Sequence, residues 1–101
     1  MSQKQQIYNL KILTNLNTII DSPNTITDLN FIQEVTQLRD VIKKNIDNQN
    51  IFTFQKIANA IQSYANRNTL NIDPRVLELF NLLKQNHDFE LGFFGSNWFG
   101  N

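Results

Sequence analysis

Few side chains in this 101-residue sequence could do chemistry, and they are scattered. The single histidine, His87, is followed by Asp88, and the chain has no cysteine to serve as a nucleophile or a zinc ligand. A lone histidine at a helix end interacts with the helix dipole more often than it acts as a base. The carboxylates lack the spacing of metal ligands, and no glycine-rich phosphate loop precedes a helix. We therefore expect a protein that is not an enzyme, with no cofactor and no metal site.

The most distinctive side chains lie in the last segment, 87–101. It contains five of the eleven aromatic residues, all three glycines and the only tryptophan, and glycine at this density disfavours a helix. The rings can fold back over one end of the molecule, or stay exposed and bind a partner, because aromatic residues are enriched in binding hot spots. Insertion at a membrane interface is a third alternative. The predicted partner-binding residues are Phe93, Phe94, Trp98 and Phe99, with His87 and Phe89 as anchors.

Four amphipathic segments precede this tail and predict the scaffold that positions it. In each of them apolar residues recur at steps of three and four, which is typical of a helix that buries one face. The segments span about 3–21, 28–47, 53–66 and 74–87. Four such helices with short connections can bury their apolar faces against one another. We expect an all-α fold, with 1–101 as a single antiparallel four-helix bundle that ends in an aromatic, glycine-containing strap at 88–101.

The pattern also predicts helix starts and buried faces. Asp73-Pro74 marks the clearest start, because the aspartate can accept a free amide proton and proline has none to leave unpaired. Thr53 is a candidate cap for the third helix, and the fourth helix is expected to be the most buried. In the first helix Ile12 is placed outside the apolar stripe. That stripe is assigned to Ile7, Leu10, Leu13, Leu16 and either Ile19 or Ile20.

Amides and charges restrict the function further. Asparagine and glutamine make up 25 of the 101 residues, and we expect them on solvent faces and helix breaks. The nine basic and nine acidic residues cancel, which weighs against nucleic-acid binding because that needs a surplus of lysine and arginine on one face. The lysines look scattered in the sequence, although a local cluster of basic residues on the folded surface stays an alternative.

No signal-peptide core or membrane span is visible. We expect a cytoplasmic protein, and peripheral association with the inner face of the membrane stays open.

A resemblance to a known family covers 54–101. It rests on an amphipathic helix at 54–64, a polar turn, Leu70-Asn71-Ile72-Asp73-Pro74 leading into a second helix, and the aromatic, glycine-containing tail at 93–100. In this order of features the chain resembles the immunity proteins for pediocin-like (class IIa) bacteriocins of lactic acid bacteria, the enterocin A and sakacin A immunity proteins among them. Many members of that family are basic, whereas this chain is neutral.

The resemblance implies a cytoplasmic four-helix bundle that protects the producer cell from its own bacteriocin. The implied partner is the membrane part of the mannose phosphotransferase permease with bacteriocin bound to it, which the immunity protein would bind from the cytosol. The C-terminal half would determine which bacteriocin is countered. No nucleic-acid partner is expected on this interpretation. The alternative is a small helical DNA-binding regulator, or a phage or plasmid adaptor protein, with the third and fourth segments as a helix-turn-helix.

Overall fold

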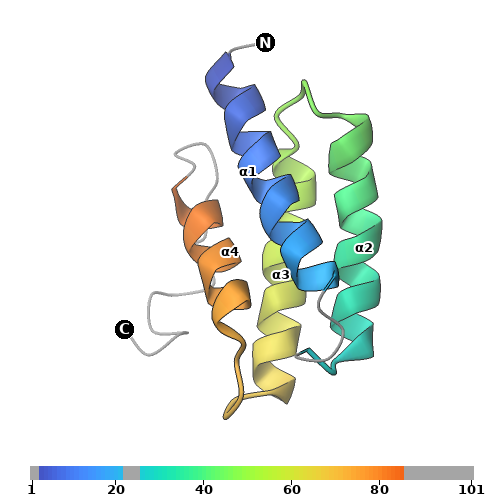
Figure 1. Ribbon diagram of the computed structural model, residues 1–101, viewed down its shortest axis with the longest axis vertical. Coiled ribbons are helices and arrows are strands. Elements are labelled where there is room, and N and C mark those ends of the chain that lie inside the picture. Colours follow the sequence, from blue (N-terminus) through green and yellow to red (C-terminus); the bar gives the residue numbers. More distant parts are fainter. Residues whose placement is uncertain (1–2, 22–25, 86–101) are drawn as a thin grey trace.

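The computed structural model describes residues 3–21 and 26–85, and these form a bundle of four α-helices (Figure 1). Each helix runs opposite to the one before it, and α1 and α3 each pack against both α2 and α4. The predicted all-α four-helix bundle is therefore confirmed, while the predicted strap at 88–101 lies outside the described residues. The helices are α1 (Gln3–Ile20), α2 (Leu29–Lys44), α3 (Ile51–Arg67) and α4 (Pro74–Lys84).

Two asparagines move the boundaries of α2 and α3 away from the predicted ones. α2 ends at Lys44, because the backbone N–H and the side chain of Asn45 both donate to carbonyls of its last turn. α3 begins at Ile51, two residues earlier than predicted. Its N-cap is Asn50, which adopts a left-handed φ of 55°, a conformation that asparagine tolerates better than most residues. Thr53, the predicted cap, instead lies buried inside the first turn of α3.

The start of α4 is formed as the sequence predicts. The Asp73 carboxylate accepts the backbone N–H of Arg75 at 2.9 Å, with Pro74 at the first helical position. α4 is not the most buried helix, however. α3 buries eight of its seventeen residues and α4 buries four of eleven. Three of the eight are alanines, whose small side chains allow neighbouring helices to approach α3 closely.

The rotation of α1 differs from the predicted one. Ile12 is fully buried, whereas Ile7 and Leu10 are 48% and 47% exposed. The buried stripe runs through positions 9, 12, 16 and 19 at steps of three and four, and so it includes the polar residue Asn9. The predicted stripe was wrong in its first half because it avoided this asparagine and used the neighbouring apolar residues instead.

Hydrogen bonds to the α2–α3 turn explain how Asn9 can be buried. Its Nδ2 donates to the backbone carbonyls of Ile46 and Asn48, both at 2.7 Å, and its Oδ1 accepts from Gln5 at 3.1 Å. These three bonds replace the water that the amide loses. Within the turn, Nδ2 of Asn50 donates to the backbone carbonyl of Asn45 and also to that of Asn48, which it shares with Asn9. The expectation that amides lie only on solvent faces and breaks is therefore wrong at position 9.

At the opposite end of the bundle, an ion pair connects the start of α2 to the end of α3. Arg67 contacts the Asp28 carboxylate with two nitrogens, at 2.8 and 3.0 Å, and Asn68 donates to the same carboxylate at 2.9 Å. Asp28 also caps α2 through the N–H of Phe31, and its side chain is 8% exposed. The hydrogen bond from Arg67 holds the pKa of Asp28 below its ordinary value, against the opposing effect of burial.

We predict that Asn9→Ala lowers the free energy of unfolding by about 2–3 kcal/mol, because two hydrogen bonds to the turn are lost, the Ile46 carbonyl loses its donor and a gap is left in the core. Asn59→Ala is the matched control. Asn59 is exposed on α3, and its loss should change stability by less than about 0.5 kcal/mol. Urea unfolding measures both. Equal effects of the two substitutions would contradict the role given to Asn9.

Arg67→Ala is predicted to lower the free energy of unfolding by about 1 kcal/mol at neutral pH. The effect is small because Arg67 is partly exposed to solvent. The folded-state pKa of Asp28 lies below its unfolded value of about 4. Its ionisation therefore stabilises the fold above that pH, and the contribution is lost as the pH falls through the folded-state pKa. The difference in the free energy of unfolding between the native protein and the variant, measured by urea unfolding, should shrink in acid. Arg39→Ala, which removes a pair with the exposed Asp40, is the control and should have little effect at any pH.

Candidate functional site

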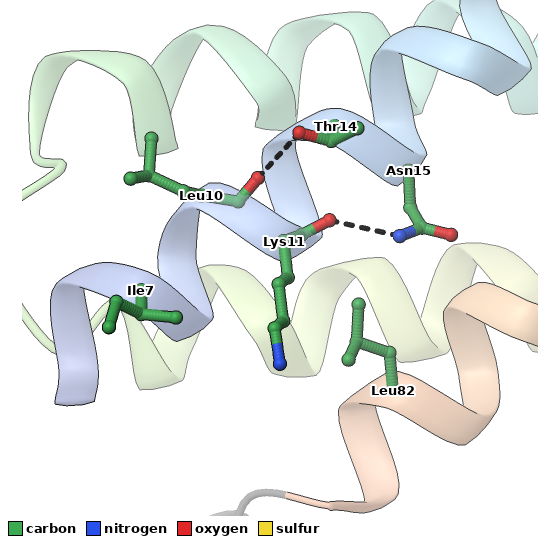
Figure 2. A pocket seen from close by; sticks show the side chains of 6 residues that line it. All are labelled: Ile7, Leu10, Lys11, Thr14, Asn15 and Leu82. Carbon is green, nitrogen blue, oxygen red and sulfur yellow. Dashed lines mark hydrogen bonds between the residues drawn. The ribbon is translucent and has the colours of Figure 1, made fainter.

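An open apolar groove runs between α1 and α4, with a volume of about 350 Å³ (Figure 2). Ile7 and Leu10 of α1 lie one turn apart along one wall, and Leu82 of α4 lies on the other. We call this feature the α1–α4 groove. Its lining residues are Ile7, Leu10, Lys11, Thr14, Asn15 and Leu82.

The polar residues of the groove leave its apolar walls uncovered. The Thr14 hydroxyl donates to the carbonyl of Leu10 at 2.9 Å, and the Asn15 amide donates to the carbonyl of Lys11 at 3.0 Å. Both side chains are thus turned toward their own helix (Figure 2). The Lys11 side chain extends into the space between the two helices. The groove therefore offers apolar contacts with a single cation beside them.

Tyr8 fixes the position of α4 against α1. Its hydroxyl donates to the carbonyl of Leu82 at 2.9 Å, and the carbonyl of Leu83 lies 3.3 Å away. The ring packs edge-on against Phe54, with 5.4 Å between the ring centres. Burial raises the pKa of the Tyr8 hydroxyl, which therefore stays a neutral donor to carbonyls in the last turn of α4, to which the backbone N–H of Gln85 also donates. As a result, α4 ends beside the first half of α1, next to the groove.

All six predicted site residues lie outside the described residues. They are His87, Phe89, Phe93, Phe94, Trp98 and Phe99. The described chain ends at Gln85, three residues after Leu82. In the sequence, the segment that carries the six residues comes shortly after Leu82, which lines the groove.

The groove itself was missed by sequence reasoning, because Ile7 and Leu10 were assigned to the core. One signal could have revealed it. The run Gln5, Asn9, Ile12, Leu16, Ile19 has helical spacing too, but its first two members are polar, and so the first half of the stripe was assigned to Ile7 and Leu10 instead. That face can be buried only because the Asn9 amide finds hydrogen-bond acceptors in the α2–α3 turn.

Other parts of the described chain offer less. A second cleft of about 350 Å³ lies between α2 and α3, with a polar lining that includes Glu34, Lys56 and Asn59. Among the described residues, no three histidine, cysteine or carboxylate side chains gather closely enough to hold a metal ion. Within the same residues, no helix is both long and apolar enough to cross a membrane.

Comparison with protein-family models, with curated proteins and with solved structures gave no match to this chain.

Proposed function

We propose that this protein is a bacteriocin immunity protein. On this proposal it protects the cell that produces a pediocin-like bacteriocin by binding, from the cytosol, to the mannose phosphotransferase permease engaged by that bacteriocin. The observation that carries the proposal is the α1–α4 groove, an exposed apolar surface whose Leu82 shortly precedes the aromatic tail in the sequence. The four-helix bundle agrees with the fold that the sequence resemblance implies.

The groove has the properties of a protein-binding surface. Ile7 and Leu10 each leave about half of their surface in water, and covering apolar surface gains about 25 cal/mol for each Å² removed from water. Lys11 can pair with a carboxylate of the partner at the edge of this contact. A protein that acts by occupying another molecule needs a surface of this kind.

The groove and the tail together would form the binding surface. The tail begins within a few residues of Leu82 and supplies large aromatic side chains, which bury much surface for little loss of side-chain freedom. Binding to one state of the permease favours that state in proportion to the difference in affinity. We therefore propose that the protein favours the closed state of the receptor without modifying the bacteriocin, and that it works in the cytoplasm, at the inner face of the membrane.

We predict that the double variant Ile7→Gln/Leu10→Gln loses protection, because two apolar contacts in the groove are replaced by polar side chains that still favour a helix. The variants are expressed in a sensitive strain, which is then challenged with a panel of pediocin-like bacteriocins. The bacteriocin concentration that inhibits growth should fall at least about tenfold relative to cells that express the native chain, because a loss of about 1.4 kcal/mol in binding free energy corresponds to a tenfold change.

Deletion of 92–101 should abolish protection while the helical circular-dichroism signal remains.

The matched control is Leu29→Gln/Leu70→Gln. These leucines are more exposed, at 77% and 92%, and lie away from the groove. The control should protect as well as the native chain. Full protection by the groove variant at equal expression would rule out the groove as the contact surface. Failure of the native chain against every peptide in the panel would argue against immunity itself.

A further inference from the structure

The charged side chains of this neutral protein are segregated along the bundle. The start of α1, the α2–α3 turn and the end of α4 point toward the same end (Figure 1). This half comprises 3–11, 37–59 and 79–85, and it holds seven cationic and two acidic side chains, a net charge of +5. The other described residues hold two arginines and five carboxylates, a net charge of −3. We call the first half the lysine-rich end. It contains every lysine of the chain: Lys4, Lys11, Lys43, Lys44, Lys56 and Lys84.

The lysines and the arginines differ in their partners, and Arg39, the one arginine of the lysine-rich end, pairs with Asp40. In the acidic half, Arg67 and Arg75 each form an ion pair at 2.8 Å, with Asp28 and Asp73 respectively. In the lysine-rich end all six lysines are exposed, and none forms a salt bridge with another described residue. Their charges are therefore available to a partner. Only Lys84 has a described contact, with its Nζ 5.2 Å from the centre of the Phe80 ring.

An exposed aromatic ring lies among these lysines. Phe52 is 81% exposed in the first turn of α3. Lys56 follows it by one turn of the same helix, and Lys43 and Lys44 end α2 at the other side of the connecting turn. An aromatic ring beside lysines favours the boundary between lipid headgroups and acyl chains, where the ring leaves water and the amines meet phosphates.

The arrangement suits a flat surface better than a nucleic-acid groove. The lysines come from all four helices, and the start of α1, the α2–α3 turn and the end of α4 point the same way (Figure 1), so an end-on approach brings positive charge from several helices toward the same surface. A duplex would be read by side chains along one helix or strand. It would also leave Phe52 in water. Lysines act as point charges on phosphates, without the bidentate geometry that arginine offers.

We propose that the lysine-rich end docks on an anionic phospholipid bilayer, with Phe52 entering the interface and the lysines contacting headgroup phosphates. This goes beyond the proposed immunity function, because it requires neither bacteriocin nor permease. The acidic half then faces away from the membrane, and the protein is oriented with the end of α4 toward the lipid. Docking depends on ionic strength, because salt screens exposed charges over about 8 Å at physiological concentrations.

The full chain is tested by flotation with vesicles made of equal parts phosphatidylglycerol and phosphatidylcholine, and with vesicles of phosphatidylcholine alone. We expect binding to the anionic vesicles only, weakened by salt. Lys43→Gln/Lys44→Gln should reduce the partition coefficient at least about tenfold, since each lysine near an anionic surface contributes measurably. Lys43→Arg/Lys44→Arg, which keeps the charge, should bind as the native chain does.

A second pair of variants tests the ring. Phe52→Gln should weaken binding several-fold, whereas Leu70→Gln, at the acidic half and 92% exposed, should not. Circular dichroism confirms that each variant is folded. The proposal is overturned if the native chain ignores anionic vesicles at low salt, if the two lysine variants bind equally well, or if the lysines affect binding to duplex DNA and not to vesicles.

Discussion

The buried amide of Asn9 is the constraint on which the arrangement of the bundle depends. An amide without access to water must find hydrogen-bond partners inside the protein, and Asn9 finds them in two carbonyls of the α2–α3 turn and in Gln5. Only one rotation of α1 brings the side chain to that turn. An apolar stripe by itself tolerates some rotation, because packing of hydrophobic side chains is not directional. A single buried polar residue removes that freedom, as it does in coiled coils.

The same rotation decides which surface the protein presents. With Asn9 and Ile12 facing inward, Ile7 and Leu10 must face the gap beside α4. Tyr8, between them in the sequence, donates to the carbonyl of Leu82 and so holds the last turn of α4 against α1. The groove and the position of its far wall at Leu82 are thus consequences of one stretch of α1. Stability and the proposed binding surface therefore share their determinants here.

Much of the scaffold could be predicted from the sequence because it depends on local signals. Helical spacing of apolar residues gave the four helices, and Asp73-Pro74 gave the start of α4. The rotation of α1 could not be predicted, since whether Asn9 faces water or the core depends on a turn some forty residues later. Likewise the net charge of zero hid the lysine-rich end, which exists only once antiparallel packing brings distant segments to one end. The six aromatic and histidine positions of the tail remain predictions.

The rotation of α1 can be measured directly, because the chain has no cysteine and a single thiol can be introduced as a probe. Leu10→Cys and Ile12→Cys are compared for their rates of reaction with a thiol reagent under native conditions. Our account predicts rapid labelling at position 10, close to the rate in urea, and strong protection at position 12. Protection at position 10 with rapid labelling at position 12 would mean that α1 packs through the simple apolar stripe, and that the groove does not exist.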